Sequence, residues 1–182
     1  ISTDDRGNLY LADIGGDGIA RTYSAIHRVE EPDPADQFGP ARIEQSWFIR
    51  FPGAREDCES FFVLNGYGYL VTKARVVGSV SIWRFFMGSA TFSTLEFVAS
   101  IETAGNVADA SLSADGRRLA FITNDGVEVF FINGNPASIS RDARADTELS
   151  LEDMEGVAFT PNGLLVTRDG AICVRHVGVR SK

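Results

Sequence analysis

Long apolar runs and an excess of basic residues are both missing from this sequence. No segment approaches the roughly 18 consecutive apolar residues that a membrane-spanning helix needs, so no membrane span is expected. Lys and Arg number 17 against 25 Asp and Glu, and the formal net charge is −8. Because a nucleic-acid surface needs clustered cations to neutralise phosphates, nucleic acid is not an expected partner either.

Residue types that carry most catalytic chemistry are also scarce, with two cysteines and two histidines in the chain. Cys58 and Cys173 are expected to be separate buried thiols, with a disulfide as the open alternative. His27 and His176 fall in expected strands and are read as packed side chains. No Gly-x-Ser-x-Gly elbow and no phosphate-binding glycine loop occurs, so no catalytic residue is assigned and enzymatic activity stays an open question.

What the sequence does contain is a repeat. Four segments share an apolar run, a glycine-centred turn and a second apolar run, and their glycines recur at intervals of about 50 residues, close to the ~40–50 residues of a propeller blade. These anchoring glycines are Gly7, Gly66, Gly116 and Gly163. Turn sequences such as Asp-Arg-Gly and Ala-Asp-Gly supply the backbone conformations that tight hairpins need, and alternating runs such as 127–132 show the two-residue period of strands. No segment carries a long helical period.

The repeat predicts an all-β fold, a β-propeller of about four antiparallel four-stranded blades. Fourth strands are expected at 42–51 and 95–101 for the first two units. The first unit starts late in its innermost strand and the fourth stops after its third, so the chain is expected to be a portion of a larger ring, whose partner is the rest of the propeller or a second subunit. The expected blades are 1–52, 53–103, 104–148 and 149–182.

Several of these segments resemble a known family. Leu9–Asp17 and Ile26–Pro32 resemble the "LYxADIGDN" and "IYRVPEP" elements of secreted bacterial WD40-like propeller proteins, and three further segments follow in the family's order. The resemblance implies an extracellular or periplasmic propeller without a defined biochemical role. More distantly the chain is similar to lactonase and phytase-like propellers, which hold Ca²⁺ in their channel. The three further segments are Asp57–Ser60, Val107–Gly116 and Met154–Gly163.

Three acidic residues are candidate metal ligands because of their place in the repeat. Glu59, Asp109 and Glu155 each stand about seven positions before a turn glycine, so we expect them at the start of inner strands, facing one mouth of the channel. Carboxylates that share such a space repel one another and need a cation or protons between them. All-oxygen ligands favour Ca²⁺. The alternative, that these acids only line a wet channel, stays open.

Asp13 and Asp17 are candidate binding residues in the loop after the second expected strand. The segment Asp13–Gly18 lacks the ligand spacing of an EF-hand, so a simple turn is the alternative. Gly16 interrupts the family element at this point.

Two functions follow from these observations. The first is a binding or scaffolding module with a protein or glycan ligand; the second is a calcium-dependent hydrolase of the esterase, lactonase or phytase type that uses the channel carboxylates.

Overall fold

The computed structural model describes most of the chain. The described residues are 1–16, 22–31, 33, 35, 39–73, 78–123, 125–140 and 154–168, together with the backbone of 171–177. Within them the secondary structure is strand apart from one 3₁₀ turn at Pro136–Ser138, which confirms the expected all-β class. No helix in this part of the chain is long and apolar enough to cross a membrane.

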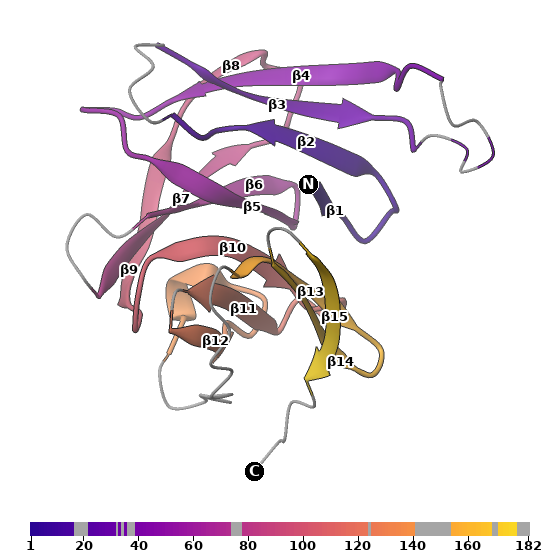
Figure 1. Cartoon of the computed structure of the whole chain (residues 1–182). Coiled ribbons are helices and arrows are strands. Elements are labelled where there is room, and N and C mark those ends of the chain that lie inside the picture. Colours follow the sequence, from indigo (N-terminus) through magenta and orange to yellow (C-terminus); the bar gives the residue numbers. More distant parts are fainter. Residues whose placement is uncertain are drawn as a thin grey trace.

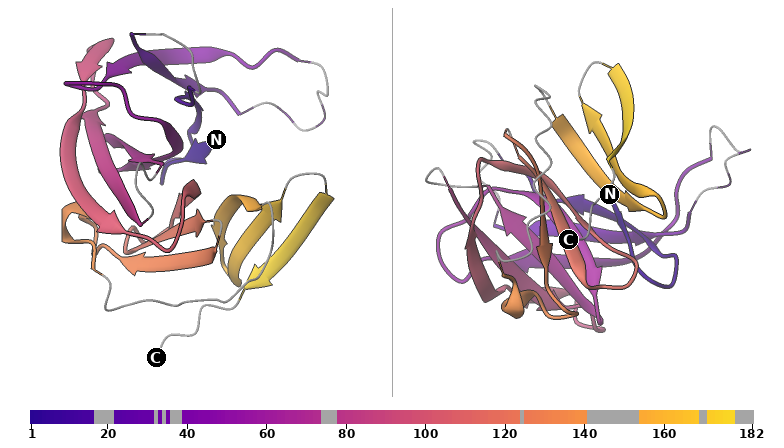
Figure 2. Two further views of the ribbon diagram at one scale, coloured as in Figure 1. Left: turned by 60° about the vertical axis from the view of Figure 1, so that its left-hand side comes forward. Right: turned by 90° about the horizontal axis from the view of Figure 1, so that it is seen from below.

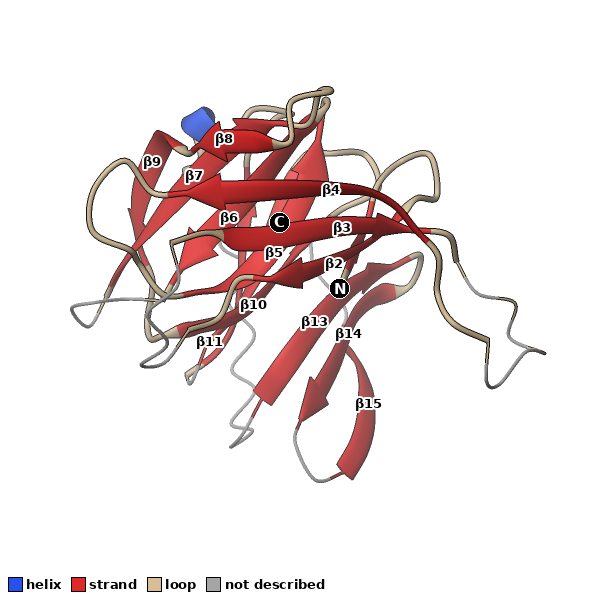
Figure 3. Cartoon of the chain, turned by 90° about the horizontal axis from the view of Figure 1, so that it is seen from above, coloured by secondary structure: helices blue, strands red, loops and turns tan. Residues whose placement is uncertain are grey.

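The first sheet, which we call blade 1, contains a strand that comes from elsewhere in the chain. Its antiparallel meander is β1 (Ser2–Thr3), β2 (Leu9–Asp13), β3 (Ser24–Val29) and β4 (Ile43–Arg50). A fifth strand, β8 (Phe92–Thr94), pairs in parallel with β4. Figure 3 shows β8 beside β4, on the side away from β3. Because β8 pairs with Phe48–Arg50, it covers the hydrogen-bonding edge of β4 at the C-terminal end of that strand.

The other three sheets follow in chain order as blades 2 to 4. Blade 2 consists of β5 (Cys58–Leu64), β6 (Tyr67–Thr72), β7 (Ser79–Phe86) and β9 (Glu96–Glu102). Blade 3 consists of β10 (Val107–Leu112), β11 (Arg118–Thr123) and β12 (Gly126–Phe131). Blade 4 consists of β13 (Met154–Thr160), β14 (Gly163–Arg168) and β15 (Ala171–Val177).

Within the described residues, a sheet of four strands, as expected for each blade, is found in blade 2. Blade 1 has five strands because the connection between β7 and β9 crosses over to it. Blades 3 and 4 each show three strands among the described residues, and Phe131 of β12 adds an isolated bridge to Ser140. The expected fourth strands are nevertheless present close to their predicted bounds, as β4 and β9.

The four blades stand around a common axis, as in a propeller that is not closed. Figure 1 shows the sheets following one another from β2–β4 to β13–β15, and the left view of Figure 2 shows them along an arc, with the N-terminus on its inner side. The innermost strands β1, β5, β10 and β13 lie next to one another in that order. This arrangement of antiparallel sheets is a β-propeller portion.

Apolar cores lie between successive blades and hold them together. Between blades 1 and 2 the core is aromatic and includes Tyr10, Trp47, Phe61 and Phe85. The core between blades 2 and 3 also contains large rings, whereas the one between blades 3 and 4 is built from smaller aliphatic side chains. Each large side chain buried in this way contributes about 1.5–3 kcal/mol. The apolar runs of the sequence are thus explained, because a strand inside the stack has to be apolar on both of its faces.

Candidate functional site

A bulge recurs at the start of the inner strands and fixes which residues of the blades are equivalent. The strand register shifts between Cys58 and Ser60 in β5, between Val107 and Asp109 in β10, and between Met154 and Gly156 in β13. The residues inside these bulges are equivalent to one another. They are Glu59, Ala108 and Glu155.

The equivalence expected for Asp109 is therefore wrong. Asp109 stands one position beyond the bulge and pairs with Ile122, so it is out of register with Glu59 and Glu155. Counting back from the turn glycine misplaced it because the hairpins differ in length. Blade 2 turns on Asn65–Gly66 alone, with φ angles of 52° and 78°, whereas blade 3 turns on the four residues between Ser113 and Arg118.

Glu59 and Glu155 are both exposed. Glu59 forms an ion pair with Lys73, whose Nζ also lies 4.0 Å from Asp57 Oδ2. A lysine that holds two carboxylates already supplies the positive charge that a metal ion would bring.

The side chain of Asp109 connects two blades by accepting a hydrogen bond from the backbone of the next blade. Its Oδ2 accepts a hydrogen bond from the Val157 amide of β13 at 2.9 Å, and two residues further on Ser111 Oγ accepts one from the Phe159 amide at 3.1 Å. These amides lie on the edge of β13 that faces β10, where no strand of blade 4 can pair with them. Burial raises the pKa of Asp109, against the opposing effect of the hydrogen bond from Val157. The contacts give Asp109 a role in joining the innermost strands of blades 3 and 4.

The described residues do not fit a calcium centre in the channel. They contain no group of three or more His, Cys, Asp or Glu side chains that could hold a metal ion, and Glu59, Asp109 and Glu155 are all among them. Asp13 ends β2 and is exposed, and Asp17 lies outside the described residues. We therefore derive no chemical step through a metal.

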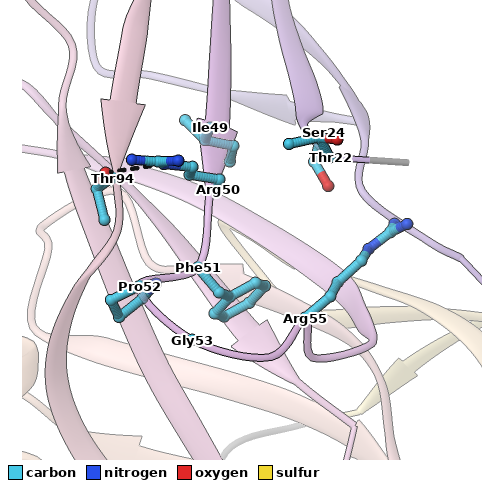
Figure 4. Close-up of a pocket in the computed structure, with 9 residues that line it drawn as sticks. All are labelled: Thr22, Ser24, Ile49, Arg50, Phe51, Pro52, Gly53, Arg55 and Thr94. Carbon is cyan, nitrogen blue, oxygen red and sulfur yellow. Dashed lines mark hydrogen bonds between the residues drawn. The ribbon is translucent and has the colours of Figure 1, made fainter. Parts of the chain in front are cut away.

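A pocket of about 460 Å³ lies elsewhere, where the C-terminal end of β4 meets the connection to β5. Figure 4 shows its lining side chains, which come from the N-terminal end of β3, the end of β4, the following connection and the end of β8. Sequence reasoning missed this pocket because β8, which completes it, comes from the connection between β7 and β9, about 40 residues further along the chain than β4. The lining residues are Thr22, Ser24, Ile49, Arg50, Phe51, Pro52, Gly53, Arg55 and Thr94.

Two arginines stand at this pocket, and each has a defined contact. Arg55 Nη2 donates hydrogen bonds to the carbonyl oxygens of Ile14 and Gly15, at 3.2 and 2.9 Å. A Cβ at Gly16 would collide with the same guanidinium, so the glycine at this position makes room for Arg55. Arg50 Nε lies 3.3 Å from Thr94 Oγ1, to which it donates a hydrogen bond across the β4–β8 pair.

Comparisons with known proteins give distant structural similarity only. No family model matches the chain, and no curated protein matches it. A Bacteroides uniformis protein provisionally assigned as a 6-phosphogluconolactonase is similar over 90% of this chain and 48% of its own, with 18% identity and a TM-score of 0.49. Kluyveromyces lactis Hsv2 is similar in two structures, over 83% of this chain and 44% of its own, with 17% identity and a TM-score of 0.38.

This chain thus spans about half the length of the solved structures that it matches. Similarity at this level carries no argument about activity, and the propeller assignment rests on the sheet order and blade packing described above.

Proposed function

We propose that this chain is a binding module, a half-ring of propeller blades that a second copy of the same chain completes. The observation that carries the proposal is that three blade-to-blade faces are packed, while in the described part of the chain no sheet lies against the two outermost faces (Figure 2). A sheet that is apolar on both faces is stable only when both are covered.

The outer face of blade 1 carries the side chains that alternate with its buried ones. Tyr10, Ile26 and Trp47 point toward blade 2, so their neighbours in sequence point away from it. These neighbours are half-buried and mostly apolar, with a hydrogen bond of 2.8 Å between His27 Nδ1 and Ser46 Oγ at their centre. The apolar members of this face are Leu9, Leu11, Ala25 and Phe48.

Blade 4 presents the complementary outer face. Val157, Leu164 and Val166 pack against blade 3, so Ala158 and Leu165 point to the side that no described blade covers. Blades 2 and 3 each pack one face of their sheet on the preceding blade and the other face on the following blade. In the described part of the chain blade 1 lacks a preceding neighbour and blade 4 lacks a following one, so packing blade 4 against blade 1 of another copy repeats the contact that joins successive blades.

A second copy supplies both missing contacts at once. If blade 4 of each copy packs on blade 1 of the other, a two-fold axis closes the ring with eight blades, which is within the ~4–8 blades of known propellers. If the rest of the propeller lies instead in further sequence of the same protein or in another polypeptide, a chain of 19.8 kDa stays unpaired in solution. That outcome separates the two arrangements.

Light scattering coupled to size exclusion tests the closure. We expect a mass of twice 19.8 kDa for the unaltered chain. Leu11→Glu and Leu165→Glu, each on a free face, are expected to give a folded monomer by circular dichroism. Phe86→Glu, at a side chain that is 61% exposed outside both faces, is the matched control and is expected to remain a dimer. A folded monomer of the unaltered chain, or a mass other than two copies, contradicts the proposal.

The binding role proposed here places a protein or glycan ligand on the loops at the rim of the ring, outside the cytoplasm. Support for the location comes from the sequence resemblance to secreted propellers, and fractionation of the native cells with an antibody to this chain tests it. Recovery in the cytoplasmic fraction contradicts the location and leaves ring closure untouched. The calcium-dependent hydrolase has no supporting observation among the described residues, and we do not propose it.

A further inference from the structure

We propose that the pocket at the end of β4 binds a small organic anion that carries a carboxylate or a phosphate ester. The inference does not depend on ring closure, because every residue that lines the pocket belongs to blade 1, to the connection after it, or to β8. The first argument is charge. Two of the nine lining residues are arginines and none is acidic, in a chain whose net charge is −8.

Arg50, which is exposed, differs from two half-buried arginines on other strands of blades 1 and 2. Arg28 on β3 pairs with Glu44 at 2.9 Å, and Arg84 on β7 pairs with Glu96 at 3.2 Å, each across adjacent strands. At the equivalent cross-strand position Arg50 faces a hydroxyl group, Thr94, and none of the carboxylates in the described part of the chain forms an ion pair with it. The charge of Arg50 is therefore not neutralised by a described side chain.

The polar groups lie at both ends of the pocket. In Figure 4, Arg50 points toward Thr94 on one side, while Arg55 extends to the other side, where Ser24 and Thr22 lie. Guanidinium groups with adjacent hydroxyls match the acceptor oxygens of carboxylates and phosphates. An anionic group bound at either end would leave the rest of its ligand over the middle of the pocket.

The middle of the pocket is apolar. Phe51 presents its ring there between the two arginines, together with Pro52 and Ile49 (Figure 4). The ring of Phe51 is held edge-on by Trp83, with centroids 5.2 Å apart, and Trp83 is held in turn by Phe97 at 5.5 Å. A floor fixed in this way favours an organic body over a bare inorganic ion. The volume of about 460 Å³ is in the range of small-molecule sites, about 300–1,000 Å³.

Arg55 is the positioned member of the pair, since two backbone carbonyls hold its guanidinium and Gly16 leaves space for it. Arg50 is the exposed member, so its replacement is expected to leave the fold intact. For this reason we choose a substitution of Arg50 to test anion binding.

Isothermal titration with three probes tests the proposal. Phenyl phosphate combines an anion with an apolar body, inorganic phosphate has the anion alone, and benzyl alcohol has the body alone. We expect phenyl phosphate to bind more tightly than inorganic phosphate by threefold or more, and benzyl alcohol not to bind. Arg50→Gln is expected to weaken phenyl phosphate at least tenfold. Arg84→Gln removes the same charge from β7 outside the pocket and is expected to change binding less than twofold.

Three results would overturn the proposal: no binding of either phosphate by the unaltered protein, equal weakening by the two arginine variants, or binding of benzyl alcohol as tight as that of phenyl phosphate. The oligomeric mass of Arg50→Gln, measured in parallel, separates this outcome from a failure of ring closure.

Discussion

The contact between Asp109 and the Val157 amide leads to a stability prediction with a defined magnitude. Replacing Asp109 by alanine leaves that amide without its acceptor at the junction of blades 3 and 4. A backbone donor deprived of its partner in this way costs about 1–3 kcal/mol. Asp109→Asn keeps an oxygen at the same position and loses only the charge. We therefore expect the free energy of unfolding of Asp109→Ala to lie about 1–3 kcal/mol below that of Asp109→Asn.

The pH dependence adds a second readout from the same pair of variants. Burial raises the pKa of Asp109 above its ordinary value of 3.8, so the folded state holds this proton more tightly than the unfolded chain does. The stability that the folded protein gains from the proton on Asp109 is fully present below the pKa that Asp109 has in the unfolded chain. It is lost as pH rises through the higher pKa that Asp109 has in the folded protein. Because asparagine does not titrate, Asp109→Asn is expected to gain stability relative to the unaltered protein as pH rises through this window.

Urea denaturation followed by tryptophan fluorescence measures both effects, at one fixed protein concentration and at a series of pH values that starts below the ordinary aspartate pKa of 3.8 and ends at neutrality. Equal stability of the alanine and asparagine variants would show that the Val157 amide does not need this acceptor. A stability difference between Asp109→Asn and the unaltered protein that is independent of pH would show that Asp109 titrates alike in both states.

Three further predictions concern other parts of the blades. Gly16→Ala is expected to displace the Arg55 guanidinium, and a lowered melting temperature together with weaker binding of phenyl phosphate checks this; an unchanged melt and affinity would contradict it. Phe121→Ala empties a site that is fully buried between blades 2 and 3 and should cost about 3–5 kcal/mol in urea denaturation. Phe131→Ala, at a ring that is 40% exposed, is its control and should cost clearly less. Asn65→Ala should cost about 1–2 kcal/mol, because alanine adopts the φ of 52° at this turn less readily than asparagine; no loss would contradict the turn assignment.

The number and order of the blades were predictable from the sequence, because a hairpin is a local structure. A turn such as Asn65–Gly66 between two apolar runs determines its own pairing, and four such turns at similar spacing determine four sheets. Fourth strands such as β4 were also recognisable, since their alternating pattern reports one covered face.

The register of the acidic residues was not predictable by counting from the glycines. Glycine serves different turn positions in different blades: Gly66 is the second residue of a two-residue turn, and Gly163 is already the first residue of β14. An error of one position is enough to take Asp109 out of register with Glu59 and Glu155.

The pocket and β8 were missed for a different reason. β8 has three residues, too few to show a period, and its partner β4 is distant in sequence, before β5 to β7 of blade 2. Nothing local to 92–94 indicates that pairing. Arg50, Arg55 and Thr94 therefore could not be brought together from their positions in the sequence.

The strand exchanged between the first two blades has a consequence for how the molecule comes apart. Because β8 is chemically part of the connection within blade 2 and yet is hydrogen-bonded into blade 1, neither sheet can unravel without disturbing the other. Amide exchange should report blades 1 and 2 as one cooperative unit. Among the described residues no strand is exchanged between blades 3 and 4, and the contacts there are smaller and aliphatic, so local unfolding is expected to begin between these two blades.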